Sequence, residues 1–161
     1  MDAIEMLEEQ HRDIEDLFDE LDSADFSDKQ DLFDELADQL AVHASIEEIH
    51  FYPAVKARRT EDILLESLEE HLTIKRLLAD LLQLDPRNEQ FAAKVAVLKD
   101  QVDLHVAEEE DDLFPKVRKV LDRKQLVALA EDMSVTMENL LDAGSPRQTV
   151  RYETQEAASL R

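Results

Sequence analysis

The amino-acid sequence predicts an all-α protein, and three observations support this fold class. Glycine occurs once and proline four times in 161 residues, whereas strands joined by tight turns need many more of these residues. Strong helix formers such as Leu, Glu and Ala are abundant. Hydrophobic residues recur at three- and four-residue intervals along most of the chain, which is the spacing of one face of a helix.

Five stretches show this helical spacing, and several of their ends carry recognisable signals. Ser27 and Gln30 have the spacing of a capping box. Asp85 followed by Pro86 suits the start of a later helix, and Gly144 suits the end of the last one. The predicted helices span residues 2–22, 28–57, 61–84, 85–121 and 123–142.

The connections between these helices are short, so consecutive helices are expected to be antiparallel neighbours. The first four should therefore form an up-down-up-down four-helix bundle. The fifth helix, 123–142, is expected to pack against the outside of this bundle. The polar segment 144–161 is expected to be a loosely ordered tail.

The chain also contains an internal repeat. The segment LEEQHRDIEDLFDEL at 7–21 resembles LEEHLTIKRLLADLL at 68–82. The segment HASIEEIHFYP at 43–53 resembles HVAEEEDDLFP at 105–115, and both follow the pattern H-x3-E-E-x3-[FY]-P. The repeat predicts a duplicated helical hairpin, and hence a pseudo-twofold axis through the bundle.

Four histidines occupy the hydrophobic stripes of four different helices: His11, His43, His71 and His105. A single histidine on such a face is usually an ordinary core residue that has found a hydrogen-bond partner. Four imidazoles at equivalent places in two repeats would be costly to bury without partners. A bound metal explains all four together.

Two glutamates strengthen this interpretation. Glu47 follows His43 by four residues and Glu109 follows His105 by four, so each pair shares one helix face. Both glutamates continue the hydrophobic stripe, where an unpaired carboxylate is rarely found. The neighbouring Glu48 and Glu110 fall on a different side of the helix and are expected to lie outside the ligand set.

Four imidazoles and two carboxylates form a mixed nitrogen and oxygen site. This donor set excludes calcium and disfavours magnesium, which leaves iron, manganese and zinc. The spacing differs from the Glu-x-x-His pattern of ferritin-like bundles and from the H-E-x-x-H pattern of zinc proteases.

The motif order, with His11, His43-x3-Glu47, His71 and His105-x3-Glu109 on successive helices, resembles the hemerythrin-like (HHE cation-binding) family over residues 1–121. With the fifth helix, the expected domain spans 1–143. The resemblance implies two iron ions, rather than manganese or zinc, joined by an oxo or hydroxo bridge. It also implies that His11 and His43 bind one iron, that His71 and His105 bind the other, and that both glutamates bridge them.

The chain departs from oxygen-carrying hemerythrin at one ligand position. That family has a further histidine four residues after the third-helix histidine, where this chain has Lys75. It also has Asp, at a longer spacing, in place of Glu109. His50 and Tyr52 are candidates for an additional ligand or a residue that supports the ligands, although an ideal helix places Tyr52 nearly opposite His43.

Two functions follow from these residues. The first is a non-haem di-iron protein that binds or turns over a small oxidant: O2, peroxide or nitric oxide. The alternative is an iron- or oxygen-responsive sensing or binding protein without turnover. If the chain is an enzyme, its activity is expected to be redox chemistry on peroxide or nitric oxide at the metal site. No catalytic residue beyond the six metal ligands is assigned.

Composition excludes several other classes. The formal net charge of −22 would repel nucleic acid and anionic membrane surfaces. The chain has no cysteine, which excludes disulfides and iron–sulfur clusters. Its N-terminal segment lacks the features of a signal peptide, and no apolar run approaches a membrane span. We therefore expect a cytoplasmic protein whose partner is a diatomic or peroxide ligand.

Overall fold

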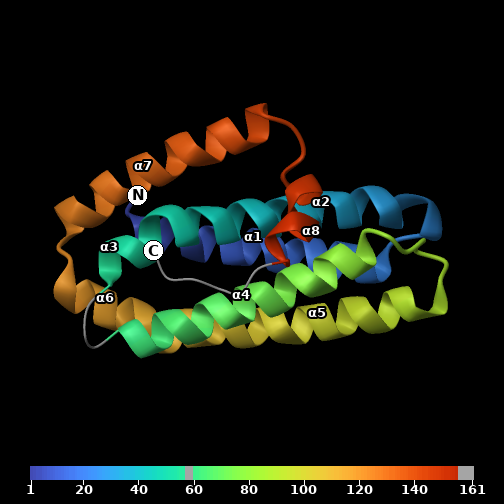
Figure 1. The fold of residues 1–161 in the computed structure, drawn as a ribbon, viewed down its shortest axis with the longest axis horizontal. Helices are drawn as coiled ribbons and strands as arrows, with labels where there is room; N and C mark the ends of the chain where they lie inside the picture. The colour runs from blue at the N-terminus through green and yellow to red at the C-terminus, as the bar shows by residue number, and fades with distance from the viewer. Residues whose placement is uncertain (57–59, 156–161) are drawn as a thin grey trace.

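The computed structural model describes residues 1–56 and 60–155, and every regular element within them is helical. The predicted all-α bundle is confirmed: α1, α2, α4 and α5 run side by side along the long axis of the molecule (Figure 1). The elements are α1 (Ala3–Ser23), α2 (Phe26–Ile46), η1 (Glu47–Phe51), α3 (Tyr52–Val55), α4 (Glu61–Leu81), α5 (Glu89–Glu108), η2 (Glu109–Leu113), α6 (Phe114–Val120), α7 (Arg123–Asp142), η3 (Pro146–Thr149) and α8 (Val150–Glu153).

The packing follows the internal repeat. Helix α1 packs mainly against α2, and α4 packs mainly against α5, so each repeat forms one antiparallel hairpin. Helix α7 lies on the outside of the bundle against α1 and α2, and its bounds, Arg123–Asp142, coincide with the predicted fifth helix. Asp122 and Gln125 cap its first turn reciprocally.

The hydrophobic core is divided into two clusters by a polar layer. One cluster includes Leu7, Ile46 and Leu68, and the other includes Ile14, Leu40 and Ile74. Along α1 and α4 a histidine lies between the residues that contribute to the two clusters, and on α2 His43 lies next to this boundary. The bundle therefore buries an imidazole layer near its middle, with hydrophobic packing on both sides that keeps water out.

Two predicted helix starts were wrong. Helix α2 begins at Phe26 after Asp25, and Gln30 donates to the side chain of Asp34 instead of completing a capping box. Helix α5 begins at Glu89, because Asn88 caps it by accepting a hydrogen bond from the backbone of Gln90. The residues between α4 and this cap form turns that local sequence signals do not distinguish from a first helical turn.

The second and fourth predicted helices are each interrupted by one π-helical segment. In both repeats the segment starts at the glutamate of the H-x3-E motif: Glu47–Phe51 and Glu109–Leu113. A π segment holds an extra residue per turn, so every side chain after it is rotated relative to an ideal α-helix. The matching position in both repeats shows that the duplication preserved this feature.

The prediction of a loosely ordered tail after 144 was wrong for residues 146–153. These residues form η3 and α8, which pack against α2 and α4 respectively. Pro146 and Val150 are buried, and Arg147 pairs with Asp38 at 2.7 Å. Residues 156–161 of the predicted tail lie outside the described part of the chain. Within that part, no helix combines the length and apolar character that crossing a bilayer requires.

Candidate metal centre

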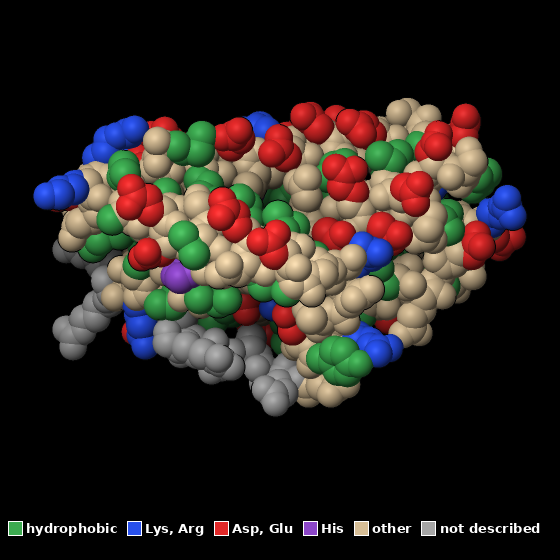
Figure 2. Space-filling view, turned by 90° about the horizontal axis from the view of Figure 1, so that it is seen from above, with side chains coloured by type: hydrophobic (Ala, Val, Ile, Leu, Met, Phe, Trp, Pro, Cys, Tyr) green, Lys and Arg blue, Asp and Glu red, His purple; other side chains and the backbone are tan. Residues whose placement is uncertain are grey.

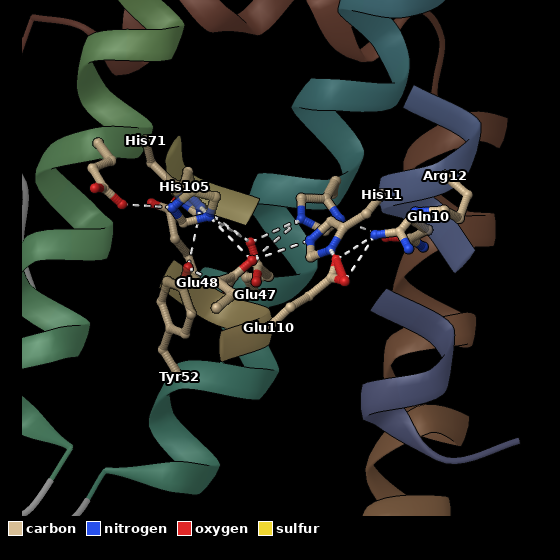
Figure 3. Close-up of polar contacts among 12 residues, drawn as sticks. Gln10, His11, Arg12, Glu47, Glu48, Tyr52, His71, His105 and Glu110 are labelled. Carbon is tan, nitrogen blue, oxygen red and sulfur yellow. Dashed lines mark hydrogen bonds and ion pairs between the residues drawn. The ribbon is translucent and has the colours of Figure 1, made fainter. Parts of the chain in front are cut away.

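The four predicted histidines converge on one buried layer, each from a different helix of the bundle (Figure 3). They form two pairs. The rings of His11 and His43 have centroids 4.9 Å apart, and those of His71 and His105 are 4.6 Å apart. Each pair combines one histidine from each helix of a hairpin, as the pseudo-twofold axis requires.

Glu47 and Glu109 lie between the two pairs and have no solvent exposure. The Oε1 atom of Glu47 is 3.1 Å from Nε2 of His43 and 3.0 Å from Nε2 of His71. The Oε1 atom of Glu109 is 3.2 Å from Nε2 of both His11 and His105. Each carboxylate therefore contacts one histidine from each pair, which is the arrangement that a bridging carboxylate needs.

The outer ring nitrogens are held by two further glutamates. Nδ1 of His71 donates to Glu48 at 3.0 Å, and Nδ1 of His11 donates to Glu110 at 2.8 Å. Glu48 and Glu110 occupy the same position in the two motifs, and both lie outside the cluster, as expected. By fixing Nδ1, they turn Nε2 of each ring toward the centre.

The other two imidazoles are fixed by residues that sequence reasoning missed. Nδ1 of His43 donates to Gln10 at 2.7 Å, and Nδ1 of His105 donates to Glu70 at 2.8 Å. Gln10 and Glu70 immediately precede the histidines of α1 and α4. The internal repeat could have identified them, because Gln10 and Glu70 occupy equivalent positions in its two halves. All four rings thus have an outer partner that sets the orientation of the inner nitrogen.

Basic side chains neutralise the outer glutamates. Arg12 donates to Glu110 at 2.8 Å. Lys75, at the position of the missing fifth histidine, is 9% exposed and donates to Glu48 at 2.9 Å. It also pairs with Glu153 of α8 at 3.2 Å. The lysine therefore binds two carboxylates and ties the C-terminal helix to the bundle beside the centre.

Three of the imidazoles have a carboxylate at both ring nitrogens: His11, His71 and His105. A carboxylate only accepts hydrogen bonds, so this geometry favours the doubly protonated ring. Nε2 of His71 and Nε2 of His105 also lie 3.1 Å apart, so at most one of these two nitrogens donates to the other. Burial alone would lower the pKa of each ring, but the adjacent carboxylates outweigh it and raise the pKa, most strongly for His105.

The pKa of Glu47 is shifted in the opposite direction to the pKa values of these histidines. Burial favours its neutral form, but the charge of His43 and hydrogen bonds from neighbouring side chains outweigh this and keep the pKa of the carboxyl well below its ordinary value. The cluster thus keeps a buried carboxylate ionised and balances it with protonated imidazoles. A metal cation could take over this balancing role if the inner imidazole protons were released.

Tyr52 reaches the centre, in contrast to its expected place on an ideal helix. Its hydroxyl donates to Oε2 of Glu109 at 3.0 Å and lies 3.2 Å from Nε2 of His71. The π segment before Tyr52 rotates its side chain inward. Burial, together with the carboxylates of Glu109 and Glu47, raises the pKa of the phenol well above its ordinary value, so it stays a hydrogen-bond donor at neutral pH.

The counterpart of Tyr52 in the second repeat is Phe114, which stacks on His11 with ring centroids 6.0 Å apart. His50, the other candidate for an additional ligand, lies elsewhere: its Nε2 is 2.6 Å from the hydroxyl of Thr136 on α7. The contact with Thr136 does not support the candidate role of His50 as an additional ligand, because the π segment that starts at Glu47 turns its ring toward α7.

Replacing Tyr52 by Phe should destabilise the protein, because it removes a donor from the buried, ionised Glu109. Hydrogen bonds to charged groups contribute about 1.5–3 kcal/mol, and a loss in this range is expected for metal-free protein in urea unfolding. Tyr152→Phe is the matched control, since Tyr152 is exposed. Equal unfolding free energies for the two variants would show that the buried hydroxyl contributes nothing.

The donor set fits a metal. Four side chains offer ligand atoms within 4.8 Å of one another: His43, Glu47, His105 and Glu109. Nε2 of His43 and Oε2 of Glu47 are buried without a hydrogen-bond partner among the described residues, although the histidine nitrogen lies 3.1 Å from the other oxygen of the glutamate. Buried polar atoms normally find partners, so two unused donor atoms in one cluster point to an additional ligand.

Comparisons with known proteins agree with this geometry. Residues 2–117 match the model of the hemerythrin HHE cation binding domain. A crystal structure of a hemerythrin HHE cation binding domain-containing protein from Mycobacterium kansasii has a TM-score of 0.77 at 25% identity, covering 99% of this chain and 95% of that one.

A curated DNA nickase from Nostoc sp. is 31% identical over 126 residues, which are 78% of this chain but only 36% of the relative. The chain thus spans about a third of the length of that relative. The motif order, the buried cluster and the match over 2–117 lead to one conclusion: the chain belongs to the hemerythrin HHE cation-binding domain family.

Proposed function

We propose that the cluster holds two iron ions and that the protein binds or turns over a small oxidant such as O2, peroxide or nitric oxide. The observation that carries this proposal is the pairing of the four rings around two buried carboxylates. His11 and His43 would hold one ion, His71 and His105 the other, and Glu47 and Glu109 would bridge them. A bound iron pair would supply the electrons that reduction of an oxidant requires.

The space beside the cluster supports a small ligand. A cavity of about 20 Å³ lies against the four histidines and is otherwise lined mainly by apolar side chains such as Ile14, Leu40 and Ile74. A cavity needs roughly 10–15 Å³ of such space to hold one water molecule. A diatomic molecule or peroxide therefore matches the cavity, whereas a larger substrate would require the bundle to open.

The chain contributes orientation and protection to this chemistry. The outer partners Glu48, Glu110, Gln10 and Glu70 fix the imidazole directions. The protonated phenol of Tyr52 donates to Glu109 and so fixes that carboxylate. The two hydrophobic clusters on either side exclude bulk water, which strengthens electrostatic interactions within the layer.

Metal analysis combined with optical spectroscopy tests the proposal. Protein purified from iron-replete cells should contain about two irons per chain, as the two ring pairs imply. The near-ultraviolet charge-transfer absorption of a ferric pair should change after addition of peroxide or O2. Zinc in place of iron, or a spectrum indifferent to every oxidant tested, would contradict the proposal.

Replacing Lys75 by His should shift the site toward reversible O2 binding and slow its consumption of peroxide. Lys75 lines the cavity beside the histidines, so an imidazole there would supply a ligand and remove one open position on that iron. Lys75→Gln is the matched control, because it removes the charge without adding a ligand. Peroxide consumption should fall by about tenfold or more only in the histidine variant, and equal rates in both variants would count against this role of position 75.

A further inference from the structure

A groove of about 860 Å³ lies where α7 packs against α1 and α2, on the outside of the four-helix bundle. Its apolar lining contains three of the four methionines in the chain: Met1, Met6 and Met137. Val135 and Leu141 also line it and are 57% and 52% exposed. Helix α7 therefore leaves part of its hydrophobic face in solvent instead of burying it against the bundle.

The rim of this groove is acidic. Its charged lining residues are Glu9, Asp13, Glu35, Asp38 and Glu131, and no lysine or arginine is among its lining residues. Figure 2 looks onto the molecule from the side of α7. Across the middle of this face acidic side chains stand between hydrophobic ones, whereas Lys and Arg lie mainly toward its ends.

We propose that the groove docks a basic amphipathic helix of a partner protein. Flexible, polarisable methionine side chains suit an adaptable surface that receives apolar anchors. A helix with apolar residues on one face and lysine or arginine on the other would fill the groove and pair with its rim, which is a recurrent mode of peptide recognition. The net charge of −22 would also accelerate encounter with a cationic partner.

The chain itself shows that the rim accepts a basic side chain. At one end of the groove Arg147 donates to Asp38 at 2.7 Å, which leaves four lining carboxylates for a partner: Glu9, Asp13, Glu35 and Glu131. The charge of the rim also makes a second copy of the chain a poor occupant of the groove. Two acidic rims would face each other across such an interface, and like charges at close range oppose association.

The groove also reaches the metal centre. Gln10 lines it, and the same side chain accepts a hydrogen bond from Nδ1 of His43 and donates to Sδ of Met137 on α7. A helix lying in the groove would therefore contact the residue that orients one of the four imidazoles. Docking itself does not depend on the oxidant chemistry proposed above, so the two proposals can fail separately.

Fluorescence anisotropy with a labelled synthetic peptide tests the docking. The probe is a helix of about five turns, roughly 18 residues, with Leu on one face and Lys on the other. A second peptide keeps the Leu face and carries Glu in place of Lys. In about 150 mM salt, where long-range attraction is largely screened, only the Lys peptide should bind the full chain saturably.

Variants locate the binding. Glu131→Lys and Val135→Gln change exposed groove residues and should each weaken binding about tenfold. Asp100→Lys, at an exposed position of α5, changes the net charge as Glu131→Lys does and should leave the affinity unchanged. Equal weakening by the two charge reversals would assign binding to overall charge and overturn the proposal. A dimer in sedimentation that Val135→Gln dissociates would assign the groove to a second copy and overturn it too.

Discussion

Replacing His105 by alanine should remove most of the iron from the protein, while the same replacement at His50 should leave the iron in place. Nε2 of His105 lies 3.2 Å from Glu109 and 3.5 Å from Glu47, so its loss deprives one half of the cluster of a nitrogen donor. His50 is half-buried and contacts Thr136 on α7. The two variants therefore compare the loss of an imidazole inside the cluster with the loss of an imidazole outside it.

Iron per chain after purification, and its rate of release to a chelator, measure this difference. Changes to residues that merely support ligands typically lower metal affinity by about 10–100-fold, so loss of a ligand itself should reach at least about 100-fold. His105→Gln, which keeps a side chain of similar volume, separates lost ligation from a cavity effect. Helical content by circular dichroism shows whether each variant folds. Full iron content in folded His105→Ala protein would exclude His105 as a ligand.

Sequence patterns predicted the bundle and the members of the central cluster because both depend on periodicity. Hydrophobic spacing identifies the buried face of each helix, and the histidines and glutamates of the H-x3-E motifs lie on that face. The internal repeat further predicted that the two halves of the bundle are equivalent in space. The structure brings His11, His71 and the two motifs together in this way, while their ligation of iron stays a prediction.

Ideal helix geometry could not place Tyr52. Nine residues after His43, an α-helix puts its side chain almost opposite the histidine. The π segment Glu47–Phe51 intervenes, and a single extra residue in the turn is enough to rotate Tyr52 inward and His50 toward α7. Pro53 was the only local sign of irregularity, and it does not reveal the direction of the rotation.

Tertiary contacts explain the error at the C-terminal end. Residues after Gly144 look polar and short of helical periodicity, so local patterns indicated little order there. Their order comes from contacts distant in sequence: Val150 joins the core, Arg147 pairs with Asp38, and Glu153 pairs with Lys75. The sequence around residues 145–155 contains no local pattern that would identify these distant partners.

Loading with iron should raise the melting temperature, and the rise should grow as pH increases from about 6 to 9. A ligand at about 100 times its dissociation constant stabilises the folded state by about 2.7 kcal/mol. For a domain of this size that corresponds to roughly 5–11 °C. Scanning calorimetry of metal-free and iron-loaded protein at a series of pH values measures the difference directly.

The pH dependence follows from the direction of the pKa shifts. In metal-free protein the pKa values of His11, His71 and His105 are raised by their carboxylate partners. The stability that these rings contribute is therefore complete below the pKa of an unfolded histidine, about 6.5, and is lost as pH rises through the higher folded values. The lowered pKa of Glu47 acts at the acid end, where its contribution is lost as pH falls through its folded value.

Metal binding reverses the trend at the histidines, because a ligating imidazole must release the proton on its inner nitrogen. Iron therefore competes with protons and binds more tightly as pH rises. Metal-free protein should melt at lower temperature at pH 9 than at pH 6, while the loaded protein should change much less. Proton release on adding Fe²⁺ to weakly buffered protein at pH 6.5 provides an independent check. A metal-free melting temperature that rises between pH 6 and 9, or iron uptake without proton release, would show that these imidazoles are not protonated in the metal-free cluster.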